Sequence, residues 1–204
     1  MKKFLTKGYL SAFIVIAVLV IDQIIKIWVK TNMYWHESIK ITDWFYIYFT
    51  ENNGMAFGME IFNKFFLTGF RIMAAIAIAY LLVQYVKKNY KTGFLVCVSL
   101  ILAGAIGNII DCVFYGEIFS ESTNSLLATF VPIGKVVDMF YFPIIDTYWP
   151  TWMPLVGGEH FIFFSPIFNF ADAAISCGII TRILFYGKYL SNIMEGPSKE
   201  KTKK

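Results

Sequence analysis

The sequence predicts an all-α integral membrane protein with four transmembrane helices, short strands and an interfacial segment. Two observations predict this class. Of the 204 residues, 57% are hydrophobic and 16% are charged, against roughly 25% charged residues in a typical globular protein. The mean hydropathy is +0.60, and four apolar stretches have about the 20 residues that a helix needs to cross a bilayer. A disordered chain, a secreted disulfide scaffold and an ordinary soluble nucleic-acid-binding protein are excluded.

The predicted spans lie in one polytopic domain over residues 1–197, followed by a basic, disordered tail at residues 198–204. They cover residues 9–29, 65–86, 94–115 and 168–186. The first span follows several lysines, as the apolar core of a signal peptide does. Its apolar run is too long for such a core, and no small-residue cleavage site follows it. We therefore expect this segment to be retained as a span.

Lysines predict the orientation. They gather in the N-terminal segment, in the loop after the second span and in the tail, which share one side if there are four spans. Acidic residues outnumber lysines in the larger loops, residues 30–64 and 117–167. The positive-inside rule then places both termini in the cytoplasm. A fifth span over residues 125–145 would contain Lys135 and Asp138 and would move the tail outside, so we expect an interfacial segment there.

The first outer loop has a strand pattern. Apolar side chains alternate with polar ones from Ile39 to Phe49, which predicts one or two short strands and then a turn at residues 52–54. Tyrosine and tryptophan residues surround this pattern. Because such side chains gather at lipid headgroups, we expect the strands to rest at that depth.

Polar side chains within the spans predict a buried site, because each is costly in lipid. Their spacing places them in pairs on single helix faces: Asp22 with Lys26, Asn108 with Asp111, and Asn169 with Asp172. The directions of the spans bring all three pairs, and Arg71, to the outer part of the bilayer. For Asp22 and Lys26, an ion pair that only positions helices is the alternative interpretation.

Carboxylates are the reactive groups of this layer. Neither His36 nor His160 lies in it, so a Ser–His–Asp set is excluded, and the sequence has no cluster with metal-ligand spacing. Two carboxyl groups in a site of low dielectric constant share a proton, so that one activates water and the other acts as an acid. This chemistry favours an aspartic peptidase. The residues alone leave open which carboxyl groups pair. They favour a proton-coupled carrier as strongly as a peptidase. A non-catalytic assembly factor is a third possibility.

Five sequence blocks resemble those of the lipoprotein signal peptidases (signal peptidase II), in the same order. They lie at residues 22–26, 52–58, 104–111, 136–139 and 168–172. The resemblance covers nearly the whole chain. It implies four transmembrane helices with a small extracytoplasmic β-cradle, in the bacterial cytoplasmic (inner) membrane, with an active site near the outer leaflet. The activity implied is removal of the signal peptide from diacylglyceryl-modified prolipoproteins, by cleavage before the lipidated cysteine.

The resemblance also implies roles for residues. Asp138 and Asp172 match the catalytic pair. The residues expected to support the site and position the substrate are Asp22, Lys26, Asn52, Gly54, Asn108, Asp111 and Asn169. The partners implied are the prolipoprotein, membrane lipids and globomycin-type inhibitors. No metal, other cofactor or nucleic acid is implied.

Two features depart from the family pattern. Cys112 stands where the family usually has arginine, so either another cation, Arg71 or Lys135, compensates or lipid recognition differs. Residues 117–135 and 142–163 look like insertions. They form either an enlarged lid over the site or additional interfacial anchoring, and we adopt anchoring as our expectation.

Overall fold

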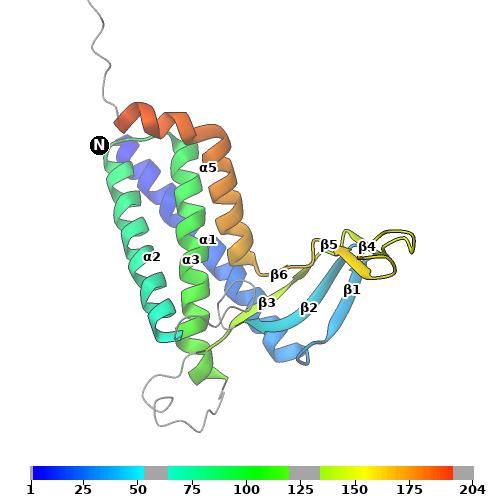
Figure 1. The fold of residues 1–204 in the computed structure, drawn as a ribbon. Coiled ribbons are helices and arrows are strands. Elements are labelled where there is room, and N and C mark those ends of the chain that lie inside the picture. Colours follow the sequence, from blue (N-terminus) through cyan, green and yellow to red (C-terminus); the bar gives the residue numbers. More distant parts are fainter. Residues whose placement is uncertain (1, 53–63, 120–133, 195–204) are drawn as a thin grey trace, which may run out of the picture.

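The computed structural model describes residues 2–52, 64–119 and 134–194, in which four long helices run side by side with two small sheets (Figure 1). The helices are α1 (Lys2–Asn32), α2 (Lys64–Lys87), α3 (Thr92–Ile118) and α5 (Phe170–Met194). The strands are β1 (Ser38–Thr42), β2 (Phe45–Asn52), β3 (Val136–Tyr141), β4 (Ile145–Tyr148), β5 (His160–Phe163) and β6 (Ile167–Phe168).

Each of these four helices is long and apolar enough to cross a membrane. Helix α3 packs against α1, α2 and α5, and 50% of its most apolar window is buried inside the protein. The corresponding windows of the other three helices are only 11% to 22% buried. Apolar side chains turned outward in this way match a helix bundle whose outer surface meets lipid.

Helices α3 and α5 approach closely because glycine leaves room between them. A Cβ atom added at Gly104 would lie 2.3 Å from the backbone oxygen of Ala171. One added at Gly107 would lie 2.7 Å from Oδ2 of Asp22 on α1. Small residues at such positions let membrane helices pack backbone to backbone. The contact brings the first turn of α5 against α3 and α1.

The described ends of the chain lie at one end of the bundle (Figure 1). The ammonium group of Lys7 on α1 donates to the backbone oxygen of Tyr90, in the turn between α2 and α3. The backbone N–H of Lys91 donates to the hydroxyl of Tyr189, late in α5. We call this the terminal end, and we call the opposite end, which carries the four-stranded sheet, the sheet end.

The larger sheet is antiparallel and has the order β1-β2-β3-β6. Strands β1 and β2 form the hairpin that the alternating pattern predicts, with Ile39 opposite Ile47. Strand β3 pairs with β2 on one side and with β6 on the other, where Phe140 lies opposite Phe168. Since β6 leads directly into α5, this pairing places β3 beside the start of the last helix.

The structure corrects three expectations. The protein is mostly helical but not all-α, because six strands lie in the described residues. Part of the expected interfacial segment at residues 125–145 is strand β3, whose first four residues are buried. Val136, Val137 and Met139 are buried on both faces of this strand, so its sequence lacks the alternation that would have identified it. The predicted fourth span begins at residue 168, whereas α5 begins at Phe170 because residue 168 belongs to β6.

The sequence-predicted insertion at residues 142–163 contains β4 and β5, which pair in a separate two-stranded sheet. Most of the insertion at residues 117–135 lies outside the described residues, as do Gly54 and the tail at residues 198–204.

We expect Gly104→Ala to lower the thermal unfolding temperature of the purified protein by several degrees. The added methyl group must push α5 away from α3, and such overpacking typically costs about 1–3 kcal/mol. Gly69→Ala is the matched control, because a Cβ atom at Gly69 meets nothing within 4 Å. Unfolding followed in detergent is the measurement. Equal unfolding temperatures for the two variants would contradict the close contact.

Candidate functional site

The polar side chains of the spans meet at the sheet end in one connected network. Its fully or largely buried members are Asp22, Lys26, Asn108, Asp111, Asp138 and Asn169. Asp172 joins them from a partly buried position. These side chains come from α1, α3, β3 and the start of α5. The network is therefore complete only when those elements pack together.

Lys26 lies at the centre of one half of the network. Its Nζ atom is 2.9 Å from Oδ2 of Asp22 and 2.8 Å from Oδ2 of Asp111. It also donates to Oδ1 of Asn108 at 3.0 Å. The side chains of Lys26, Asp22 and Asp111 are fully buried. Three hydrogen-bonded oxygens satisfy the three donors of an ammonium group, which offsets its loss of hydration.

Two further residues join this half. The amide of Gln23 donates to Oδ2 of Asp22 at 3.1 Å and to Oδ1 of Asp111 at 3.0 Å. The hydroxyl of Tyr115 donates to Oε1 of Gln23 at 3.0 Å. Neither residue was among those predicted from the sequence to belong to the site. Gln23 carries a usable signal, since it is an amide inside a span, whereas Tyr115 at a span end resembles an ordinary interfacial tyrosine.

The first turn of α5 positions Asp172. Oδ1 of Asn169 accepts the backbone N–H of Asp172 at 2.9 Å, and Oδ2 of Asp172 accepts the backbone N–H of Asn169 at 3.4 Å. This reciprocal pair is a capping box, with Asn169 as the N-cap. Oδ1 of Asp22 accepts the N–H of Ala171 at 2.9 Å. The box holds a carboxylate at a helix N-terminus, where the helix dipole favours negative charge.

Two asparagine side chains link Asp138 to Asp172. Nδ2 of Asn169 donates to Oδ1 of Asp138 at 2.7 Å and to Oδ1 of Asn108 at 3.2 Å. Nδ2 of Asn108 donates to Oδ1 of Asp172 at 2.7 Å. A continuous chain of hydrogen bonds thus runs from one acid to the other. It joins β3, α3 and α5, and through Asn108 it meets Lys26.

Asp138 is an unusually weak acid for a carboxyl group. Burial raises its pKa, the negative charge of Asp172 raises it further, and the pKa reaches about 7. Hydrogen bonds from Asn169 and Asn52 and the charge of Lys26 act in the opposite direction. A pKa this high means that Asp138 holds a proton over much of the acidic and neutral range. The two carboxyl groups lie near each other, because Asn169 donates to both of them.

A second ionic cluster lies beside the first. The carboxylate of Glu51 on β2 pairs with Lys30 on α1, and its Oε2 is 3.2 Å from Nζ of Lys135, just before β3. Burial alone would raise the pKa of Glu51, but the two lysines outweigh it and lower the pKa. Glu51 thus stays ionised and ties α1 to the two central strands.

Arg71 contacts the cysteine that departs from the family pattern. Nη1 of its guanidinium group donates to Sγ of Cys112 at 3.4 Å. Of the two cations weighed from the sequence, Arg71 therefore lies at Cys112, whereas Lys135 binds Glu51. A part in lipid recognition stays a prediction for Arg71.

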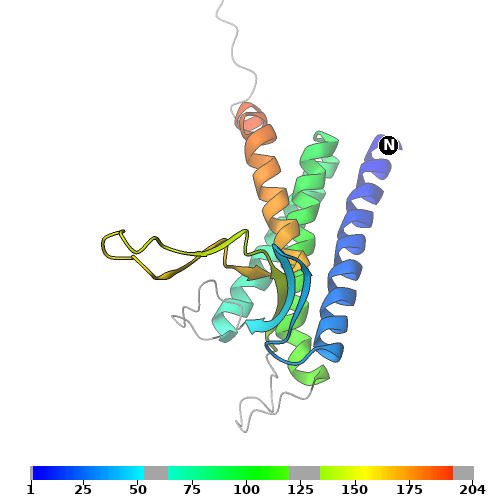
Figure 2. The ribbon, with the colours of Figure 1, turned by 90° about the vertical axis from the view of Figure 1, so that its right-hand side faces the viewer.

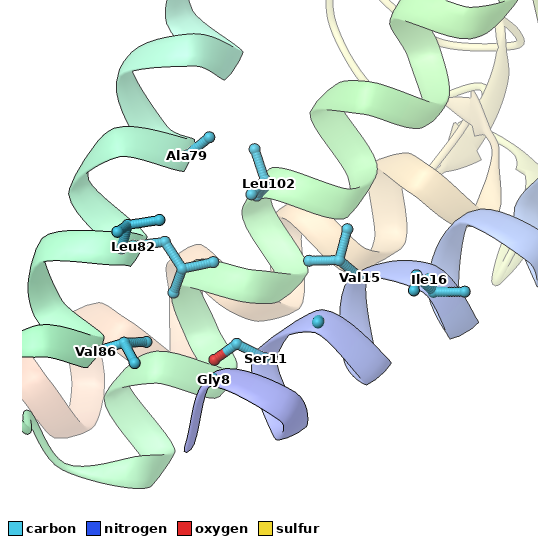
Figure 3. Close-up of a pocket in the computed structure, with 10 residues that line it drawn as sticks. Gly8, Ser11, Val15, Ile16, Ala79, Leu82, Val86 and Leu102 are labelled. Carbon is cyan, nitrogen blue, oxygen red and sulfur yellow. The ribbon is translucent and has the colours of Figure 1, made fainter. Parts of the chain in front are cut away.

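A cavity of about 380 Å³ lies away from these acids, between α1, α2 and α3 toward the terminal end (Figure 3). Its lining includes Gly8, Ser11, Val15, Ala79, Leu82, Val86 and Leu102. Ser11 is the single polar side chain among its lining residues, and none of them carries a carboxyl group or an imidazole. The cavity suits an apolar chain but offers no acid–base pair.

Comparisons with known proteins identify relatives of this chain. Residues 14–187 match the family model described as Signal peptidase (SPase) II. A lipoprotein signal peptidase of Porphyromonas gingivalis is 47% identical, covering 94% of this chain and 89% of that protein. One of Amoebophilus asiaticus is 35% identical, covering 84% of this chain and 75% of that protein.

Solved structures of bacterial membrane enzymes, determined by the in meso method, share the fold. One has a TM-score of 0.59 and 25% identity, and the match covers 95% of this chain and 93% of that one. A second has a TM-score of 0.57 and 27% identity, and the match covers 85% of this chain and 89% of that one.

We expect Asp138→Asn to make the protein more stable than the unchanged chain at alkaline pH. The native pKa of Asp138 is raised to about 7, so the native state keeps a proton that the unfolded state has already lost. Stability therefore falls as pH rises from about 4 to about 7. Asparagine at position 138 stays uncharged, and its Oδ1 atom still accepts the hydrogen bond from Asn169. The stability of the variant should therefore not fall over this pH range.

Thermal unfolding in detergent at about pH 5 and about pH 8.5 measures this effect. The unfolding temperature of Asp138→Asn should exceed that of the unchanged protein by several degrees at the higher pH, and by less at the lower. Asp43→Asn is the control, because Asp43 is an exposed partner of Lys40. A difference between Asp138→Asn and the unchanged protein that does not widen with pH would contradict the raised pKa.

Proposed function

Because the chain belongs to the signal peptidase II family, we propose that Asp138 and Asp172 are the catalytic pair of an enzyme that cleaves before a diacylglyceryl-modified cysteine. Membership makes the protein an aspartic-type peptidase that removes signal peptides from prolipoproteins. The observation that supports the choice of this pair is the chain of amide hydrogen bonds that connects the two acids.

The two environments favour different roles for the acids. Asp138 holds the proton, since its pKa is raised to about 7. Asp172, at the N-terminus of α5, is the base in this proposal and takes a proton from water as the water attacks the scissile carbonyl carbon. Asp138 donates its proton to the carbonyl oxygen. When the tetrahedral intermediate collapses, the C–N bond breaks, Asp172 gives its proton to the leaving amine, and Asp138 recovers one from the diol.

The remaining predicted residues act as positioning residues in this proposal. Lys26 holds Asn108, which in turn holds Asp172. Asp22 fixes the start of α5 through the N–H of Ala171, and Asp111 completes the partners of Lys26. Asn52 bonds to Asp138 directly. The role of Gly54 stays a prediction, because it lies outside the described residues.

The proposal places the sheet end outside the cytoplasm. The turn between α2 and α3 carries Lys87, Lys88 and Lys91 at the terminal end, and the positive-inside rule assigns such a turn to the cytoplasm. Both described ends of the chain share that side. The catalytic pair then lies near the outer leaflet, and the diacylglyceryl chains of the substrate extend into lipid between helices. Globomycin-type peptides would compete for the same site.

The two alternative functions lead to different expectations. A carrier usually binds its cargo at discontinuous helices near the middle of the membrane. Here α1, α2, α3 and α5 run unbroken through their spans, and the acids lie at one end, which favours the peptidase. An assembly factor would keep its activity when the acids are replaced.

We expect Asp138→Asn and Asp172→Asn each to slow cleavage of a lipidated prolipoprotein at least about a thousandfold, because each removes one partner of the acid–base pair. The measurement uses purified enzyme in detergent, with products identified by mass. Asp43→Asn is the matched control and should cleave at the unchanged rate. The unchanged enzyme should leave an unlipidated prolipoprotein intact.

Each contrary result has a separate meaning. Processing by the double variant Asp138→Asn/Asp172→Asn would show that the pair is wrongly assigned. Equal cleavage of lipidated and unlipidated substrate would show that the lipid does not contribute to substrate specificity. Solute flux driven by a pH gradient, with no peptide product, would favour the carrier.

We also expect kcat/KM to fall as pH rises above about 7, because Asp138 loses the proton that it must donate. Asn52→Ala should move this fall to higher pH, since the hydrogen bond from Asn52 lowers the pKa of Asp138. Initial rates with lipidated prolipoprotein across the pH range are the measurement, and Asp43→Asn should reproduce the unchanged profile. A rate that keeps rising well above pH 7 would contradict Asp138 as the acid.

A further inference from the structure

The β4–β5 hairpin extends away from the rest of the protein. In both views it runs crosswise to the helices, on the side of the four-stranded sheet (Figures 1 and 2). Its base is firmly held, because the ring of Phe142 stacks on Phe45 at 4.6 Å and on Phe168 at 5.6 Å. Its direction is therefore set by the sheet.

One face of the hairpin is mostly apolar, and its polar members are Thr147 and Glu159. Ile145 lies opposite Phe163, and Thr147 lies opposite Phe161. Directly opposed residues, and residues two apart along a strand, share a face of a sheet. Trp149 extends this face by packing on Phe161, with ring centroids 4.6 Å apart. Ile145 and Phe163 are each about half exposed, at 50% and 53%.

The other face is more polar. Here Tyr148 lies opposite His160, and Asp146 lies opposite Ile162. The imidazole of His160 pairs with the carboxyl group of Asp146 across the two strands. Both of these side chains keep about half of their surface exposed. The hairpin thus has one mostly apolar face and one face that combines the acid–imidazole pair with Tyr148 and Ile162.

The tip of the hairpin exposes two large apolar side chains. Trp152 is 79% exposed, and Leu155 is 100% exposed. The backbone of Leu155 has φ 71°, in the left-handed region that non-glycine residues seldom adopt. The chain holds a leucine outward in a costly conformation, without burying it against another described residue. Large exposed apolar side chains of this kind are typical of a contact with a membrane or with another protein.

The hairpin lies close in sequence to a candidate span. Phe163 ends β5, and Phe170 begins α5, a candidate span. Six residues, 164–169, separate these two positions, so their Cα atoms lie at most roughly 25 Å apart, and β6 pairs this connection with β3. Tyr34, Trp35 and Trp44 are also exposed at the sheet end. Exposed tyrosine and tryptophan side chains gather at lipid headgroups.

We propose that the β4–β5 hairpin lies on the surface of the bilayer, with its Ile145–Phe163 face and its tip in lipid and its Asp146–His160 face in water. The occupant of the apolar face is phospholipid, because the hairpin runs crosswise to the candidate spans (Figures 1 and 2) and leads through β6 into the span of α5. The hairpin is then a second membrane attachment, separate from the four helices. This proposal does not depend on which acids are catalytic.

Site-directed nitroxide labels test the proposal in nanodiscs of phosphatidylethanolamine and phosphatidylglycerol. Ile145→Cys and Leu155→Cys place the label on the apolar face and at the tip, and Tyr148→Cys places it on the opposite face as the matched control. The background variant is Cys177→Ser, because Cys177 is exposed, whereas Cys97 and Cys112 are buried. Unchanged thermal unfolding temperatures verify that each labelled protein is folded.

At positions 145 and 155, collisions of the label with oxygen should exceed collisions with a water-soluble nickel chelate severalfold, since oxygen partitions into lipid. At position 148 the preference should reverse. Nickel accessibility at all three positions would show that the hairpin lies in water and would overturn the proposal. Shielding of position 145 or 155 from both reagents would also overturn it, because protein would then cover the face, as a lid or as a second copy.

Discussion

The buried ammonium group of Lys26 is the interaction on which the rest of the structure depends. An unpaired charge at this depth would cost several kcal/mol, so α1 and α3 can pack here only with Asp22, Asp111 and Asn108 in place. Asp22 also accepts the N–H of Ala171, and Asn108 donates to Asp172. One charge on the first helix thereby fixes the beginning of the last helix and the acid that it carries.

The carboxyl groups at the sheet end lie in different surroundings, which affect their pKa values differently. Glu51 has two lysines beside it, and its pKa falls. Asp138 is buried beside another acid, and its pKa rises to about 7. Asp172 belongs to a capping box at a helix start, where carboxylate charge is favoured. Packing alone thus shifts the pKa values of Glu51 and Asp138 in opposite directions, although both are carboxyl groups.

Local periodicity explains which features could be predicted from the sequence. Helix geometry places Asp22 with Lys26, and Asn169 with Asp172, on single faces, so the polar layer and the four spans were predictable. Strand β3 was not, because its partners β2 and β6 are distant in sequence and its buried residues do not alternate. The contact between Arg71 and Cys112 likewise depends on the packing of α2 on α3. Asp138 was identified by family resemblance, since nothing in its local pattern marks it.

The direct pairing of β3 with β6 makes the segment between them an independent appendage. Phe140 lies opposite Phe168, so the chain leaves the sheet and returns to it at one place. Asp138 precedes that closure, and Asp172 follows it. The sequence between can lengthen, shorten or be exchanged while both acids keep their positions, since the entropic cost of a longer surface loop grows slowly. Evolution can therefore remodel this appendage to suit a particular envelope without altering the hydrolytic machinery.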